Sequence, residues 1–446
     1  MTGSAGAATG GDHGTLSLPM AFCVALKQVI GGGVIVLTGT AVALTGAGAV
    51  PAYGLACVVI LLLSLPYAVL GAAVPESGAL YRWPSRFIAP PAGFAAFWLV
   101  LSTHVGLAAY AATFGDTLHA LLPAIPARPA AIAVLLAVLA LNLSGTRSSA
   151  AAGIVVTAVT AACLLLLAVR GLPRIDPARL TPLLPHGSHG LLTAAALLTW
   201  PISGATLVSE LAGDMRRPAR DVPVSILGAT LCAAILYAMV ALVAAGTAPA
   251  PGVDRPLDRV AAAILSPTTL LLFGLGTGVV SMLGIINAHM LWGSRSITMA
   301  CRDGWLPRAL GGAGTDGTPR PALLLLGAIG LAPILCGVGT ADIVRVCALG
   351  AGISAILSVS CAPIFARREP DAYRRSALFL PLPALLAVSA LAIASQGVTL
   401  VLLLRDLSPG PLLGWCGWVA LGAVVAALRY GSVAGRPSFR PIDRVS

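Results

Sequence analysis

The feature that most constrains this sequence is a succession of long apolar runs, separated by short segments that carry most of the charge. A helix needs about 20 apolar residues to cross the roughly 30 Å hydrocarbon core of a bilayer. Twelve runs approach or exceed that length, over residues 18–46, 52–74, 92–115, 129–144, 150–169, 190–212, 223–247, 268–292, 321–341, 346–366, 378–404 and 411–428. The sequence therefore predicts an all-α integral membrane protein with about twelve transmembrane helices.

The composition excludes several other classes of protein. Only 10% of the residues are charged, whereas soluble domains carry about 25%, so a water-soluble enzyme is excluded. The runs are continuously apolar and do not alternate in polarity, which excludes a transmembrane barrel. The net charge of +11 is spread over loops and does not indicate a nucleic-acid surface. The nine cysteines lack metal-ligand spacing, and we expect neither a metal nor a cofactor.

The distribution of basic residues predicts the orientation in the membrane. An even number of spans places both ends of the chain on one side. One set of alternating loops holds eighteen Arg residues and the other holds eight. The positive-inside rule therefore predicts a multi-pass protein of the cytoplasmic (plasma) membrane with both termini in the cytoplasm. We interpret residues 1–17 as a disordered cytoplasmic tail and residues 429–446 as a C-terminal tail.

Glycines interrupt the first span near its middle. Ile30 is followed by Gly31, Gly32 and Gly33, and each glycine costs about 1 kcal/mol relative to alanine inside a helix. Irregular backbone at membrane depth survives only where it lines a cavity or contacts protein. The triplet therefore favours an unwound segment, with close helix–helix packing as the alternative.

A second candidate break lies in the sixth span, at Trp200, Pro201, Ile202, Ser203 and Gly204. Proline removes a backbone donor, although a simple kink is the alternative. The first and sixth spans correspond if residues 18–170 and 190–366 form two five-helix repeats of inverted topology, followed by two further helices over 378–428. Interrupted helices at matching positions indicate a transporter binding site. Free N–H groups suit a carboxylate and free carbonyls suit an ammonium group, which together favour an amino acid or a related amine.

Four stretches resemble the amino acid–polyamine–organocation permeases. They are VIGGGVIVLTG (29–39), LPYAVLGAAVPESGALYRWPSR (65–86), SGATLVSELAGDMRRPARDVP (203–223) and SMLGIINAHMLWGSRSITMACRDGWLPRAL (281–310). Their order and spacing are similar to those of the family and extend over spans one to ten.

This resemblance implies a LeuT-like fold with five-plus-five inverted repeats, and transport by alternating access rather than catalysis. It implies that the main-chain N–H groups of Gly31, Gly32 and Gly33 bind the substrate carboxylate. Main-chain carbonyls at residues 200–203 would then bind the amino group. Trp200 occupies the family's aromatic gate position, with an ordinary packed aromatic as the alternative.

Charged and polar residues within the spans are candidates for ion coupling or gating. Some family members hold a Lys in the fifth helix, where this sequence has Thr160. Lys27 lies one turn before the glycines, so it is a candidate replacement for that charge or for a sodium ion, unless it reaches the membrane edge. Glu210 is a candidate inner-gate residue or an interfacial carboxylate. Ser281 and Asn287 share a helical face that could line a path or join helices.

The resulting prediction is a secondary transporter for an amino acid or a close amine, coupled to H⁺ or Na⁺. Alternatives are an exporter or exchanger of a small non-protein metabolite, and a membrane sensor that binds its ligand without moving it. The lipid bilayer and the small substrate are the expected partners, and no nucleic acid is expected. The sequence leaves the oligomeric state, the direction of transport and the identity of the substrate open.

Overall fold

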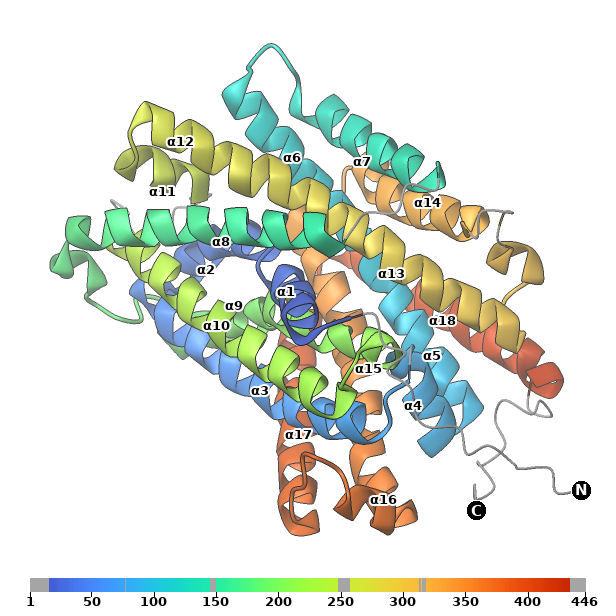
Figure 1. Cartoon of the computed structure of the whole chain (residues 1–446). Helices are drawn as coiled ribbons and strands as arrows, with labels where there is room; N and C mark the ends of the chain where they lie inside the picture. Colours follow the sequence, from blue (N-terminus) through green and yellow to red (C-terminus); the bar gives the residue numbers. More distant parts are fainter. Residues whose placement is uncertain are drawn as a thin grey trace, which may run out of the picture.

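A computed structural model describes residues 16–76, 78–144, 150–247, 257–312, 314 and 318–433. In this part of the chain the secondary structure is helical, apart from a single bridge between Leu16 and Met215. Figure 1 shows the long helices packed side by side in a bundle, with α16 beyond one end of it. The helical class predicted from the apolar runs is confirmed.

The first half of the chain contains α1 (Leu18–Val29), α2 (Gly32–Thr45), α3 (Ala49–Ala73), α4 (Ala79–Phe87), α5 (Pro90–Ser102), α6 (Gly106–Leu121), α7 (Ala127–Leu143) and α8 (Ala150–Gly171). The second half contains α9 (Gly187–Ser203), α10 (Pro218–Thr247), α11 (Leu257–Ile264), α12 (Pro267–Gly274), α13 (Ser281–Asp303), α14 (Arg320–Cys336), α15 (Thr340–Arg368), α16 (Pro370–Arg374), α17 (Leu382–Arg405) and α18 (Pro409–Val433). Within the described residues, nine helical runs are long and apolar enough to cross a membrane, and three shorter apolar helices accompany them.

Several predicted spans change their helical pitch along their length. The third run consists of α5 and α6 joined by the 3-10 turn η2 (Thr103–Val105), and the eighth passes from α12 to α13 through the π-helical η6 (Leu275–Val280). The sixth run passes from α9 into an eleven-residue 3-10 helix, η5 (Gly204–Asp214). Such local changes of pitch often occur at functional sites.

The outer helices present apolar surface, as a membrane protein requires. On α18, Leu413 is 73% exposed and Leu428 is 78% exposed. Two tryptophans attach α18 to α5, since Trp98 Nε1 donates to the carbonyl of Trp418 at 2.9 Å and Trp418 Nε1 donates to that of Trp98 at 3.1 Å. The predicted terminal tails lie mostly outside the described residues, and α18 continues to Val433.

Candidate substrate-binding site

The first span is interrupted at two residues. α1 ends at Val29, and α2 begins at Gly32. Between them, Ile30 and Gly31 leave the helical conformation, with Gly31 fully extended at φ −148° and ψ −152°. An interruption of this kind leaves carbonyls at the end of α1 and N–H groups at the start of α2 without helical partners.

Side chains from two other helices cover this interruption. The hydroxyl of Tyr237 on α10 donates a hydrogen bond to the carbonyl of Val29, which also accepts one from the N–H of Gly31 at 2.8 Å. Ile285 of α13 lies against Gly31, where a methyl group would come within 2.6 Å of its Cδ1 atom. Gly32 and Gly33 belong to the first turn of α2, where the helix dipole is positive.

The sixth span differs from the predicted break. α9 continues through Pro201 to Ser203, and η5 follows directly, so the helix becomes narrower without an extended gap. The Ser203 hydroxyl donates to the carbonyl of Trp200 at 2.7 Å, and the Thr206 hydroxyl donates to that of Ser203 at 2.8 Å. The carbonyls of Trp200 and Ser203, two of the four predicted to bind an amino group, therefore accept hydrogen bonds from local hydroxyl groups.

The two spans meet at Gly204. A methyl group placed there would lie 2.2 Å from the carbonyl oxygen of Gln28 and 3.2 Å from the nitrogen of Val29. The missing side chain thus lets the main chain of η5 touch the last turn of α1. The contact brings together the two regions of the sequence that carried the predicted breaks.

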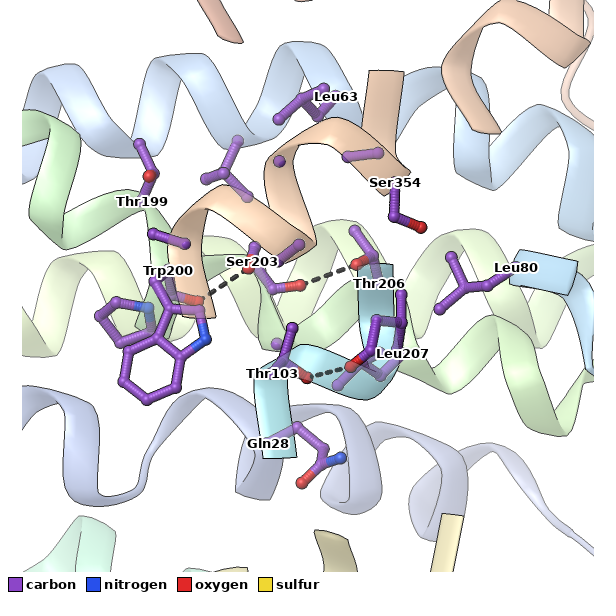
Figure 2. Close-up of a pocket in the computed structure, with 18 of the residues that line it drawn as sticks. Gln28, Leu63, Leu80, Thr103, Thr199, Trp200, Ser203, Thr206, Leu207 and Ser354 are labelled. Atoms are coloured by element: carbon purple, nitrogen blue, oxygen red, sulfur yellow. Dashed lines mark hydrogen bonds between the residues drawn. The ribbon is translucent and has the colours of Figure 1, made fainter. Parts of the chain in front are cut away.

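A cavity of about 80 Å³ adjoins this contact. Because each water centre needs about 10–15 Å³, the cavity has room for about five to eight water molecules, which is comparable to a small amino acid. Figure 2 shows Gln28, Trp200, Ser203 and Thr206 around it. Among the described lining residues none is Asp, Glu, Lys or Arg.

One wall of this substrate cavity is aromatic. The ring of Trp200 stacks on that of Tyr110, with centroids 5.8 Å apart and planes inclined by 12°. His289 lies 5.2 Å from Tyr110 and 5.3 Å from Trp292. Trp200 therefore packs against Tyr110 and also lines the cavity.

A larger cavity of about 660 Å³, here called the vestibule, lies between α1, α7, α8, η5 and α13. Lys27 and Asn287 line it, together with Asp214 and Arg295, whose charged groups approach to 3.5 Å. Three residues line both cavities, namely Gln28, Leu207 and Trp292. These three side chains form a partition between the substrate cavity and the vestibule.

Of the predicted residues, Trp200, Pro201, Ser203 and Gly204 line the substrate cavity, whereas Ile30, Gly31, Gly32 and Gly33 are not among its described lining residues. The others also lie outside it. Ile202 is fully buried in the apolar core. The Thr160 hydroxyl donates to the carbonyl of Val156 within its own helix at 2.8 Å. Ser281 is 2% exposed on α13. Glu210 is 9% exposed, and its Oε1 atom accepts a hydrogen bond from the N–H of Leu80 at 2.6 Å.

Several lining residues were not identified from the sequence. They include Gln28, Thr103, Tyr110, His289, Trp292, Ser354 and Gln396. Gln396 and His289 did carry a signal, because a polar side chain inside a membrane span is costly without a partner or a function. Spacing alone could not show which of these side chains face one common space.

Comparison with known proteins identifies the family. Residues 16–427 match the family described as amino acid permease. The branched-chain amino acid permease BcaP of Bacillus subtilis is 27% identical over 311 residues, covering 64% of this chain and 66% of BcaP. The methylthioribose transporter of Bacillus subtilis is 30% identical over 248 residues, covering 50% and 52% of the two chains. The vacuolar cationic amino acid transporter 8 of Arabidopsis thaliana is 27% identical over 234 residues, covering 48% and 40%.

Each of these alignments spans less than two thirds of the relative's own length. The family match nevertheless includes all twelve predicted spans except the final residue of the last one. Together with the all-helical, multi-span structure, it shows that this chain belongs to the amino acid permease family and has the LeuT-like multi-span fold of that family.

Proposed function

We propose that this protein is a secondary transporter for an amino acid or a closely related amine, which binds where the first and sixth spans meet. The observation that carries the proposal is the main-chain contact between Gly204 and Gln28 beside a small, uncharged cavity. A site built from main-chain groups suits the carboxylate and ammonium groups that all α-amino acids share. The relatives named for amino acid transport support the same class of substrate.

The substrate carboxylate would bind to the N–H groups of Gly32 and Gly33 at the start of α2, and to that of Gly31 once it gives up its hydrogen bond to the Val29 carbonyl. Such groups form an anion site together with the positive end of the helix dipole. Ile285, which lies over Gly31, has to move aside for this binding. The ammonium group would bind at the carbonyls of residues 200–203, where it replaces the hydroxyl donors of Ser203 and Thr206.

The two cavities support transport by alternating access. Among the described residues, three line both the substrate cavity and the vestibule, namely Gln28, Leu207 and Trp292. These three side chains form the partition between the two cavities. Displacement of these side chains would join the cavities into a path toward Asp214 and Arg295. We assign that end to the cytoplasm of a plasma-membrane protein, in keeping with the arginine distribution and inverted repeats over 18–170 and 190–366.

Lys27 is the proposed coupling residue. It lines the vestibule, and a methyl group at Gly284 would lie 3.4 Å from its Nζ atom. Its ammonium group therefore lies between α1 and α13, in the vestibule. From there its charge would take the place of the sodium ion or fifth-helix lysine that the family resemblance implies, and release of its proton would couple transport to H⁺. Asn287 adds a polar group to the same wall, and its Oδ1 atom accepts a hydrogen bond from Asn142 Nδ2 at 2.8 Å.

Counterflow in proteoliposomes tests the proposal. Vesicles that contain the protein and are loaded with an unlabelled amino acid should accumulate the labelled form from outside. Vesicles prepared without the protein should not accumulate it. Accumulation of a non-protein metabolite with no amino acid active would favour the exporter or exchanger alternative. Saturable binding of an amino acid without counterflow would show a sensor, and would refute transport.

A further inference from the structure

The helix α17 contributes one polar side chain to the substrate cavity. α17 follows the ten predicted spans assigned to the two repeats, yet its residue Gln396 lines the cavity. Gln396 is 3% exposed, and its Oε1 atom is buried without a hydrogen-bond partner. Buried polar atoms are nearly always paired, so an unpaired amide oxygen at a cavity wall indicates that its partner comes from the cavity.

Ser354 of α15 makes a second, similar observation. It is 1% exposed, lines the same cavity, and its Oγ atom is also buried without a partner. Figure 2 shows Ser354 and Gln28 on opposite sides of the cavity. Ser354 therefore lies across the cavity from α1, on the side toward which the side chain of a bound amino acid would point. Gln28 Oε1 on α1 and Trp292 Nε1 on α13 line the same cavity and are also buried without a partner.

A glycine holds the Gln396 amide in this position. A methyl group at Gly352 on α15 would lie 2.2 Å from the Nε2 atom of Gln396. The close approach of the amide to the α15 backbone therefore depends on the absence of a side chain at residue 352. The amide is fixed by packing at the cavity wall, which is the arrangement that a specific contact needs.

The charge of the cavity limits what these groups can bind. None of the described lining residues is Asp, Glu, Lys or Arg. A charged substrate side chain would thus be buried without a counter-charge, which is strongly unfavourable. A hydroxyl or amide group, in contrast, can donate to Gln396 Oε1 and pair with the hydroxyl of Ser354.

We propose that Gln396 and Ser354 determine specificity by binding an uncharged, hydrogen-bonding side chain of the substrate, a hydroxyl or a carboxamide. The inference rests on the proposed function, and it selects neutral polar amino acids over apolar and charged ones. A site built to hydrogen-bond a substrate group discriminates strongly against an analogue that lacks it, because its own polar groups are then left unpaired.

The first experiment compares isosteric substrates in proteoliposome counterflow. Threonine and valine have nearly the same shape, as have asparagine and leucine, while lysine and glutamate test charge. We expect the polar member of at least one pair to be taken up with a kcat/KM at least tenfold higher than the apolar member, and the charged amino acids to be inactive. Equal rates within both pairs, or preferred transport of a charged amino acid, would overturn the specificity inference and leave the transporter proposal standing. No counterflow of any amino acid would instead refute the transporter proposal.

The second experiment removes the contact. Gln396→Met keeps the length of the side chain but cannot hydrogen-bond, and Ser354→Ala removes the hydroxyl. Both should lower the polar-to-apolar ratio of kcat/KM at least tenfold, with the rate for the apolar member retained. Ser389→Ala is the matched control, because Ser389 is a buried, unpartnered serine of α17 outside the cavity lining. Equal losses of kcat/KM for the polar and the apolar member of a pair would show a purely structural role and refute the proposal. A polar-to-apolar ratio that is unchanged in both variants would also refute it.

Discussion

Gly204 and Gln28 bring the sixth span into main-chain contact with the first, with only 2.2 Å between the position of a methyl group on Gly204 and the Gln28 carbonyl oxygen. Alanine at position 204 must separate η5 from α1. Overpacking of this kind costs about 1–3 kcal/mol. We expect Gly204→Ala to lower the thermal stability of the purified protein and to abolish counterflow.

The control is Gly54→Ala on α3, where the added methyl group meets no atom within 4 Å. That variant should match the parent protein in both measurements. If Gly204→Ala transports at the parent rate, the contact is not required for function.

Tyr237 stabilises the interruption of the first span. Its side chain is fully buried, and its hydroxyl donates to the carbonyl of Val29. Tyr237→Phe removes this bond and should lower the free energy of unfolding by about 0.5–1.5 kcal/mol, measured as a lower midpoint of thermal unfolding in detergent. Tyr430→Phe, at a residue that is 49% exposed on α18, should leave the midpoint unchanged. A Tyr237→Phe midpoint equal to that of the parent would show that the carbonyl needs no such donor.

Glu210 joins η5 to the start of α4 through its side chain and its main chain. Its Oε1 atom accepts a hydrogen bond from the N–H of Leu80 at 2.6 Å, and its main-chain carbonyl accepts one from the N–H of Gly78 at 3.1 Å. Glu210→Gln retains an acceptor and should fold nearly as well as the parent. Glu210→Leu leaves the Leu80 N–H unpaired and should destabilise the protein by about 1–3 kcal/mol, measured by thermal unfolding. Equal destabilisation by both substitutions would show that the negative charge matters and not the acceptor.

The glycine triplet and Pro201 show how far the sequence could predict this site. Three glycines lower helix stability whatever their surroundings, so an interruption close to them could be predicted from residue type. Its exact place could not, because Ile30 and Gly31 leave the helix whereas Gly32 and Gly33 belong to α2. At Pro201 the helix continues to Ser203 although the proline offers no N–H to the carbonyl of Leu197. A proline alone does not tell whether a helix bends, breaks or continues, because the surrounding packing decides among these outcomes.

The cavity lining was harder to predict, because it depends on how distant helices are rotated. Gln396 faces the cavity from α17, about 370 residues after Gln28, and no spacing rule relates the two. Thr160, which the family resemblance placed at the position of a fifth-helix lysine, donates a hydrogen bond within its own helix. Lys27 was identified because a lone cation in an apolar run is costly, a criterion that needs no tertiary information.

Lys27 provides a test of ion coupling. If its charge couples transport to an ion, Lys27→Ala should make uptake independent of an imposed proton or sodium gradient and flatten its pH profile. Lys27→Arg keeps the charge but does not release its proton, so it should support uptake without a response to the proton gradient. Uptake by Lys27→Ala with an unchanged gradient response and pH profile would refute the coupling role.

Cys23 offers a direct measurement of movement between the cavities. It lines the vestibule and is partly accessible, whereas Cys347 on α15 is fully buried. A ligand shifts a conformational equilibrium only when it binds the two states differently. We expect a transported amino acid to change the arrangement of the partition formed by Gln28, Leu207 and Trp292. The rate at which N-ethylmaleimide alkylates Cys23 should therefore change when the amino acid binds, as measured by mass spectrometry of peptides. Cys347 should stay unreactive throughout, and an amino acid that gives no counterflow should have no effect. A Cys23 rate that is the same with and without saturating substrate would show that the vestibule does not rearrange on binding.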